Sequence, residues 1–111
     1  MIAQIGVYKR QNDAQPTKIF SVHRIFLTVS QKIGDWLELG EEAATAAKAG
    51  NKAKLKEIEQ EATEKTIEIF RALFEDFEPD DLNYMDQREL RDFMVKLALN
   101  LQGDFETVRK N

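Results

Sequence analysis

The stretch of sequence that decides the fold is KAKLKEIEQEATEKTIEIFRALFEDF, residues 52–77. Its apolar side chains recur at steps of three and four, which is the period of an α-helix with one apolar face. Glutamates and lysines fill the positions between them, on the face that would meet water. This pattern carries no reactive group, so it predicts a helix that packs or binds rather than one that catalyses. The positions of the apolar face are Leu55, Ile58, Ala62, Thr66, Ile69, Phe70, Leu73, Phe74 and Phe77.

A second helix is predicted before this stretch, beginning between Ser21 and Thr28. Gly34 inside it is unfavourable for a helix and marks a close helix contact. The alanine-rich residues 43–49 either continue this helix with weak packing or fray. Gly50-Asn51 then provides a stop and a turn. The apolar stripe of this helix consists of Phe26, Val29, Ile33, Trp36 and Leu37.

The segment after residue 77 contains the signals of two further helices. The long helix is expected to end near Glu78, because Pro79 disfavours helical geometry in the residue before it. Pro79 can itself open a short helical turn. Asp86 and Glu89 have the spacing of an acidic capping box. They precede an apolar run at helical spacing, for which Gly103 is a plausible C-terminal cap.

These elements predict an all-α fold, an antiparallel three-helix bundle with an extra short helix and an extended N-terminal arm. With 111 residues the chain is expected to be a single helical domain over residues 1–111. Residues 1–18 are predicted to be an arm or a partly ordered segment, either loosely ordered or paired with a neighbour. Residues 104–111 are predicted to be a flexible tail.

Composition excludes several classes of protein. A net charge of −4 and a pI near 5.1 argue against a nucleic-acid binder, which needs a basic surface. The absence of cysteine excludes disulfides and thiolate chemistry and suits a reducing cytosol. No segment approaches the length of a membrane span or a signal peptide, so we expect no membrane association and a cytoplasmic location. The first quarter is basic and residues 75–92 are mostly acidic, which permits head-to-tail self-association, although solvated charge is the commoner explanation.

No set of side chains has the spacing of a catalytic or metal site. His23 is the only histidine, so a nitrogen or sulfur metal site cannot be assembled in one chain. Asp80, Asp81 and Asp86 lack the alternating ligands of a calcium loop and are explained by helix capping. The glutamates of residues 57–68 lack the Glu-x-x-His motif of di-metal bundles. We therefore expect no catalytic residue, no metal ligand, no cofactor and no enzymatic activity.

Aromatic residues are more numerous than a small three-helix core requires, with seven phenylalanines and one tryptophan. Most are expected to lie in the core. Those near the ends of the ordered region are the best candidates for a partner or self-association surface, because exposed aromatic residues dominate many interfaces. The candidate partner-binding residues are Phe20, Ile25, Phe26 and Phe105.

The order of four segments resembles a known family. They are KIFSVHRI (residues 18–25), IEIFRALF (67–74), FEPDDL (77–82) and DQRELRDFM (86–94). Together they resemble the small tail assembly chaperones of long-tailed bacteriophages, over about residues 18–102. Members of that family are mostly helical and often carry Phe-(Thr or Pro)-x-Asp-Asp-Leu before a final helix with an acidic cap. The alanine-rich residues 43–49 depart from the family pattern by lengthening the region between the first two helices.

This resemblance implies a non-enzymatic phage tail assembly chaperone. It would bind and solubilise the helical tape measure protein during tail morphogenesis in the cytoplasm of a bacterial host, self-associate along that client, and be absent from the finished virion. It also implies a longer form made by a −1 ribosomal frameshift, whose added domain recruits the tail tube protein. The residues Arg109-Lys110-Asn111 are compatible with a slippery heptanucleotide in the coding DNA.

Two other functions fit the same helices. One is a small helical adaptor or regulatory protein, of the anti-repressor or secretion-chaperone type, that holds one folded partner. The other is a structural phage connector subunit that stays in the particle. In the chaperone hypothesis, an amphipathic groove covers the apolar stripes of an unassembled client. Many weak contacts along one client then add up to a high avidity.

Overall fold

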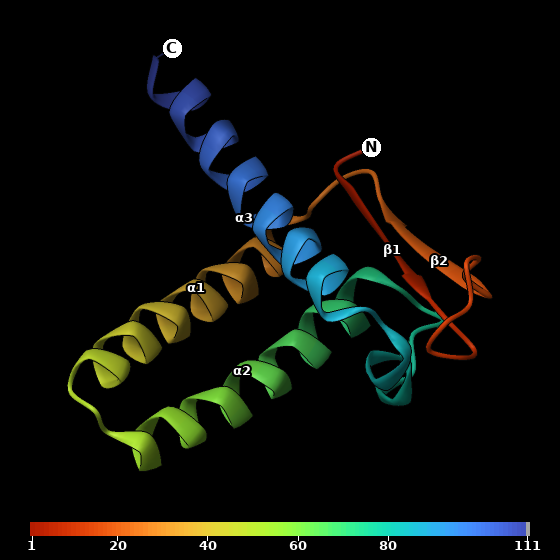
Figure 1. The fold of residues 1–111 in the computed structure, drawn as a ribbon. Coiled ribbons are helices and arrows are strands. Elements are labelled where there is room, and N and C mark those ends of the chain that lie inside the picture. Colours follow the sequence, from red (N-terminus) through yellow and green to blue (C-terminus); the bar gives the residue numbers. More distant parts are fainter. Residues whose placement is uncertain (111) are drawn as a thin grey trace. The chain divides into compact units, whose positions relative to one another are not determined.

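The chain forms six elements that belong to two compact units. The computed structural model describes the backbone of residues 1–110 and the side chains of residues 1–101. Unit 1 comprises Met1–Ile25 and the chain from Phe74 onward, and unit 2 is the intervening Phe26–Leu73. Unit 2 is therefore an insertion in the sequence of unit 1. In chain order the elements are β1 (Ala3–Val7), β2 (Lys18–Val22), α1 (Leu27–Lys48), α2 (Lys52–Leu73), the 3-10 helix η1 (Pro79–Tyr84) and α3 (Gln87–Lys110) (Figure 1).

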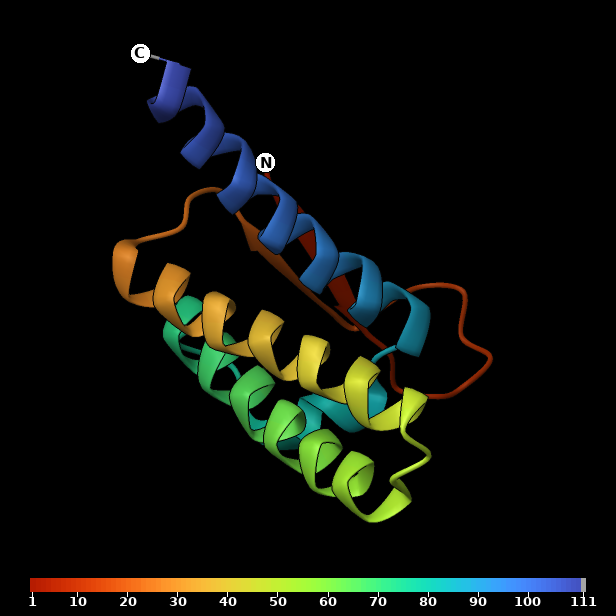
Figure 2. The same ribbon diagram turned by 90° about the vertical axis from the view of Figure 1, so that its left-hand side faces the viewer.

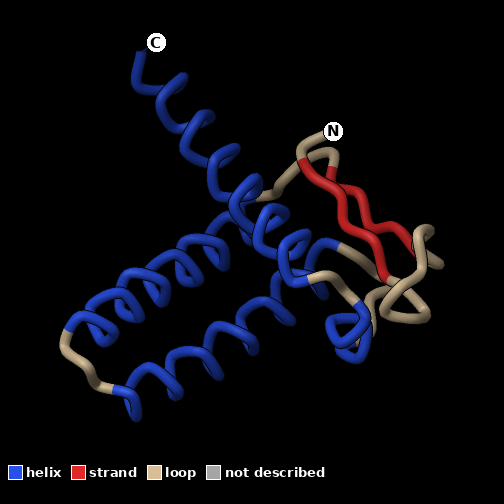
Figure 3. Tube along the Cα trace, viewed as in Figure 1, coloured by secondary structure: helices blue, strands red, loops and turns tan. Residues whose placement is uncertain are grey.

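The prediction of an all-α fold is wrong, because the expected N-terminal arm is a β-hairpin. Strands β1 and β2 pair antiparallel, with Ile5 opposite Phe20 at the centre of the register (Figure 3). Apolar residues alternate along both strands, which is the period that places every second side chain on one face of a sheet. The buried face of the hairpin consists of Ala3, Ile5, Val7, Phe20 and Val22.

Gly6 of β1 lies close to Pro16, which precedes β2. A Cβ atom on Gly6 would lie 2.9 Å from the Cβ of Pro16 and 3.3 Å from its Cγ. The proline ring is rigid, so it cannot move aside as a long side chain would. Gly6 is therefore required by the close approach of Pro16 and not by an unusual backbone angle.

Helix α3 packs on strand β1 within unit 1, whereas α1 and α2 pack on each other within unit 2. The predicted three-helix bundle is therefore replaced by a helical hairpin and a separate helix on a β-hairpin. The helix end predicted at Gly103 is also wrong, because α3 continues to Lys110. Flexibility of the predicted tail stays a prediction, and residue 111 lies outside the described part of the chain.

An aromatic cluster joins the N-terminal hairpin to the segment that follows α2. The ring centroid of Phe20 lies 4.7 Å from that of Phe74 and 5.9 Å from that of Phe77. Phe74 in turn lies 6.4 Å from Phe93 of α3. Such tilted and edge-on pairs add to the stabilisation from burial alone. The long helix ends at Leu73 rather than near Glu78, because Phe74 and Phe77 leave the helical repeat to pack on Phe20.

Lys18 of β2 also binds the segment that follows α2, beside the aromatic cluster. Its ammonium group donates to the backbone carbonyl of Asp76 at 2.7 Å and to the carboxylate of Asp81 at 3.3 Å. The same ammonium group lies 4.7 Å from the centroid of the Phe20 ring, within the range of a cation–π interaction. Asp81 also accepts a bond from the backbone N–H of Glu78, which closes the start of η1.

The start of α3 confirms Asp86 as its cap but changes the role predicted for Glu89. The Oδ1 atom of Asp86 accepts bonds from the backbone N–H groups of Arg88 at 2.8 Å and Glu89 at 3.0 Å. These bonds satisfy two amides that the helix itself leaves free. The Glu89 carboxylate accepts a bond from the Tyr8 hydroxyl at 2.9 Å. Glu89 thereby ties α3 to the chain that leaves β1.

The predicted turn at Gly50-Asn51 is confirmed. Helix α1 continues into the alanine-rich segment and ends at Lys48. Gly50, which follows the C-cap Ala49, has a φ of +68°, a left-handed geometry that favours glycine. The N–H of Gly50 donates to Ala47 and that of Asn51 to Ala46, which is the Schellman pattern. The Asn51 side chain then accepts a bond from the N–H of Lys54, in the first turn of α2. Asn51 thus stabilises the end of α1 through its backbone and the start of α2 through its side chain.

Helices α1 and α2 lie side by side and antiparallel in unit 2 (Figure 2). Two ion pairs cross between them, Lys32 with Glu68 at 3.7 Å and Lys65 with Asp35 at 3.8 Å. Gly34 does not mark a close helix contact as predicted, because a Cβ atom there would meet nothing within 4 Å. The buried residues of the two helices are Val29, Ile33 and Ala46 in α1 and Ile58, Thr66, Ile69 and Phe70 in α2.

The helices of unit 1 and unit 2 are amphipathic rather than uniformly apolar. None of the described helices combines the length and the apolar composition that crossing a bilayer requires.

The single domain expected over residues 1–111 stays a prediction. Contacts within the chain divide it into two compact units, and each unit is defined by its own internal contacts.

Substituting Gly6 with alanine is expected to destabilise the protein. The new methyl group would clash with Pro16, and overpacking of this kind costs about 1–3 kcal/mol. Gly34→Ala is the matched control, since open space surrounds that position and alanine favours helix over glycine by roughly 0.5–1 kcal/mol. Urea unfolding followed by circular dichroism measures both. Equal stability of Gly6→Ala and the parent would contradict the close contact.

Candidate functional site

Phe20, a predicted partner-binding residue, lies in the core. Only 2% of its surface is exposed, and its ring packs on Phe74 and Phe77. The prediction chose it as an aromatic residue near the end of the ordered region. Because Phe20 lies in a paired strand, period-two alternation directs its side chain inward instead. Phe20 is thus unable to contact a partner while the hairpin is folded.

The other three predicted residues have different surroundings. Ile25 is half-buried, and Phe26 is exposed over 69% of its surface. The side chain of Phe105 lies outside the described residues. Phe26 is therefore the predicted residue that the structure places fully on the surface.

Leu27, which the sequence pattern did not single out, lies next to Phe26 and is 74% exposed. It falls off the stripe that runs from Phe26 through Val29 to Ile33. Leu27 could have been identified from the sequence as a large apolar residue that lies beside the stripe at the start of the helix. Phe26 and Leu27 together form an exposed apolar pair, and we call them the Phe26–Leu27 pair.

The backbone of Phe26 is fixed although its side chain is exposed. Phe26 has an extended conformation and is the N-cap of α1, with no side-chain hydrogen bond capping the helix. Its carbonyl oxygen accepts bonds from the N–H groups of Val29 and Ser30, both at 3.0 Å, and from the Ser30 hydroxyl at 3.3 Å. An apolar N-cap is unusual, since serine, threonine, aspartate and asparagine are strongly preferred there. The Phe26–Leu27 pair thus lies at an ordered helix start. Its apolar N-cap makes α1 less stable than a polar N-cap residue would.

Other large apolar residues are exposed in unit 1. Val95 and Leu99 are 42% and 59% exposed and lie one turn apart on α3. Ile19 of β2 is 57% exposed and Tyr84 is 49% exposed. Isolated exposed apolar residues are ordinary in soluble proteins. The Phe26–Leu27 pair differs because its members are adjacent in sequence and more exposed than any of these four.

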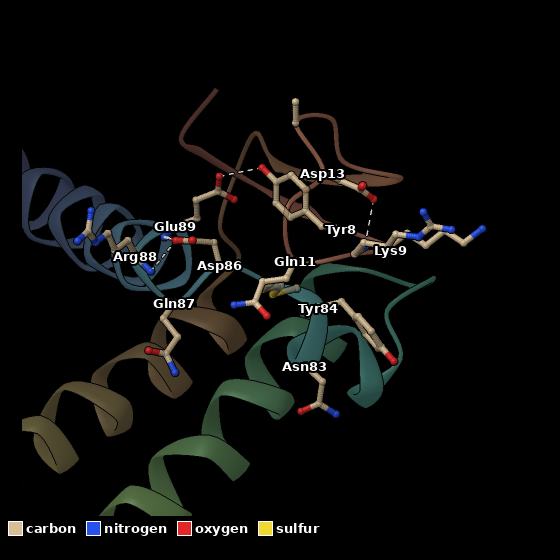
Figure 4. Close-up of a pocket in the computed structure, with 13 residues that line it drawn as sticks. Tyr8, Lys9, Gln11, Asp13, Asn83, Tyr84, Asp86, Gln87, Arg88 and Glu89 are labelled. Atoms are coloured by element: carbon tan, nitrogen blue, oxygen red, sulfur yellow. Dashed lines mark hydrogen bonds between the residues drawn. The ribbon is translucent and has the colours of Figure 1, made fainter.

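A concavity lies in unit 1, beside the start of α3 (Figure 4). It has a volume of about 820 Å³ and is formed by the chain after β1, the end of η1 and the first turn of α3. Its charged lining residues are Lys9, Arg10, Asp13, Asp86, Arg88 and Glu89.

The three carboxylates of this concavity, which we call the basin, already make structural hydrogen bonds. Asp13 accepts a bond from the N–H of Arg10, Asp86 caps α3, and Glu89 binds the Tyr8 hydroxyl. Figure 4 shows Lys9 and Arg88 on opposite sides of the basin, directed away from its centre. The basic groups therefore do not converge on one point, as an anion site would require. The basin is an open polar surface with structural hydrogen bonds.

Shifted acid–base properties in the described residues have local causes. The hydrogen bond to Glu89 raises the pKa of Tyr8, because the neutral phenol donates to a negative carboxylate. The hydrogen bond between Lys65 and Glu68 lowers the pKa of the Glu68 carboxyl and raises that of Lys65. His23 is exposed. Within the described side chains, no three residues of the types His, Cys, Asp and Glu gather in a group that could hold a metal ion.

Comparison with protein-family models, with curated proteins and with solved structures found no match. The resemblance to tail assembly chaperones therefore rests on the sequence segments alone.

Truncating Phe20 is expected to destabilise the protein, whereas changing Phe26 is not. Phe20→Ala removes a buried ring from the aromatic cluster, and such changes cost about 3–5 kcal/mol. Phe26→Ser replaces an exposed ring by a preferred N-cap residue, so the free energy of unfolding should stay unchanged or rise by about 0.5–2 kcal/mol. Thermal unfolding of both variants measures the difference. A large loss of stability in Phe26→Ser would show that Phe26 is covered.

Glu68 is expected to titrate below the ordinary glutamate value of 4.5, because Lys65 donates to its carboxylate at 3.0 Å. A lowered pKa in the folded state contributes stability above pH 4.5 that is lost as the pH falls through the folded value. NMR titration of the side-chain carboxyl carbon measures the midpoint directly. Lys65→Met should return the midpoint toward 4.5, and an unchanged midpoint in this variant would exclude Lys65 as the main cause.

Proposed function

We infer that the protein is a non-enzymatic tail assembly chaperone of the phage type, which holds the helical tape measure protein until the tail is built. The observation that supports this most directly is the Phe26–Leu27 pair, with 69% and 74% of its surface exposed on an ordered helix start. Exposed apolar surface is unfavourable in water and suits a surface that is covered when a partner binds.

The scaffold beneath the pair is well suited to presenting it. The turn at Gly50-Asn51 closes the helical hairpin tightly, and α1 and α2 pack through their buried stripes with ion pairs of Lys32 and Lys65 between them. A rigid support limits the conformational entropy lost when a partner binds. The pair therefore offers a small preformed contact rather than a deep groove, which differs from the amphipathic groove expected from the sequence.

A small contact is appropriate for a chaperone that must release its client. Two apolar side chains that become fully buried contribute roughly 1.5–3 kcal/mol each, which is far short of tight binding. Many copies bound along one long client would raise the avidity, since neighbouring sites act at high effective concentration. Competing tail subunits could then displace the weak individual contacts.

Replacing the pair is expected to abolish retention of the client. The variant Phe26→Ser/Leu27→Ser is co-expressed with the proposed client, a tagged tape measure protein, and the client is purified. The parent should co-purify with the client and keep it in the supernatant, whereas the variant should be lost and the client should aggregate. Circular dichroism checks that the variant keeps its helix content.

The matched control is Ile19→Ser/Leu99→Ser, which removes two exposed apolar side chains from unit 1. This control should co-purify with the client like the parent. Equal retention of the client by the parent and the Phe26→Ser/Leu27→Ser variant would reject the Phe26–Leu27 pair as the contact. Detection of the protein as a component of purified virions would instead support a structural connector subunit.

A further inference from the structure

The Phe26–Leu27 pair lies at the same end of the helical hairpin as Arg71, whose positive charge is not paired with any carboxylate among the described side chains. The ion pairs between Lys32 and Glu68 and between Asp35 and Lys65 show which residues of the antiparallel helices α1 and α2 lie at the same level. Arg71 follows Glu68 by three residues and therefore lies about one helical turn closer to the hairpin end where α1 begins. Arg71 is exposed and makes no ion pair with another described residue.

Negative charge is missing from the same end of α1. The first turn of α1 contains no acidic residue, and no side chain caps its free amides. The apolar pair is thus accompanied within unit 2 by the basic Arg71 and by no carboxylate in the first turn of α1, although the whole chain carries a net charge of −4.

We propose that the Phe26–Leu27 pair docks an acidic amphipathic helix of the partner, with apolar residues on the pair and carboxylates toward Arg71. This inference rests on the proposed function and specifies the chemistry of the client segment. Charged groups at the rim of an apolar contact steer association and select among partners more than they add affinity. A partner helix with lysines beside the same apolar stripe would meet like charge and bind more weakly.

A pair of designed peptides tests this preference with the full-length protein. Both peptides are amphipathic helices with one leucine stripe, and their polar positions are glutamate in one and lysine in the other. Fluorescence anisotropy of the labelled peptides measures Kd at low and at high salt. The net charge of the protein by itself favours the lysine peptide, so a preference for the glutamate peptide must arise locally.

The glutamate peptide is expected to bind about tenfold more tightly than the lysine peptide at low salt, and the ratio should shrink as salt screens the rim charges. Phe26→Ser/Leu27→Ser should weaken the glutamate peptide about tenfold or more, whereas Ile19→Ser/Leu99→Ser should leave its Kd unchanged. Arg71→Glu should remove the preference while circular dichroism shows the same helix content.

Three results would overturn the proposal. Equal or tighter binding of the lysine peptide would exclude the charge selection, and a glutamate-peptide Kd unaffected by Phe26→Ser/Leu27→Ser would place binding elsewhere. Self-association of the parent that is lost in Phe26→Ser/Leu27→Ser, seen by sedimentation, would make a second copy the occupant. Failure of the proposed function is distinct, because a protein that selects the glutamate peptide could still leave the tape measure protein unbound.

Discussion

The packing of Phe20 against Phe74 and Phe77 is the contact on which unit 1 depends. It joins a hairpin near the start of the chain to the segment that enters η1 and α3, and Lys18 reinforces it through Asp76 and Asp81. Burial of aromatic rings provides the main stabilisation here, since each phenylalanine removes a large apolar surface from water. Lys18 restricts the orientation of the packed segments, because its ammonium group contacts a backbone carbonyl, a carboxylate and an aromatic ring at the same time.

The same contact explains why unit 2 can consist of helices alone, whereas unit 1 contains a β-hairpin. Once the β-hairpin and the segment after Phe74 are held together, α1 and α2 need only to bury their apolar faces against each other. Unit 2 has a local turn, a local ion-pair register and its own buried stripe. The Phe26–Leu27 pair is left at the start of this insertion, outside the stripe that α1 buries. A binding role for the insertion is consistent with this division, because a change in the pair leaves the cluster around Phe20 intact.

Much of the helical structure could be predicted from the sequence, and the errors have physical reasons. The turn at Gly50-Asn51, the short helix at Pro79 and the cap at Asp86 follow from local chemistry and are confirmed. The β-hairpin was missed because its short strands show alternation over only five residues each, and their pairing is not local. The end of α2 was placed too late because Phe74 and Phe77 continue the helical period, although they pack on a strand. Exposure of Leu27 depends on tertiary packing, which periodicity alone does not reveal.

The double role of Asn51 also affects the way in which the chain closes unit 1. Lys18 and Asp76 are separated by 58 positions, and a flexible loop of that length makes closure costly in entropy. The Schellman turn and the cap on Lys54 need only neighbouring residues, so α1 and α2 can fold back on each other early. An antiparallel pair brings Leu27 and Leu73 back to the same end of unit 2, which shortens the effective loop between Lys18 and Asp76. The helical hairpin therefore reduces the conformational entropy that unit 1 loses when Lys18 binds Asp76.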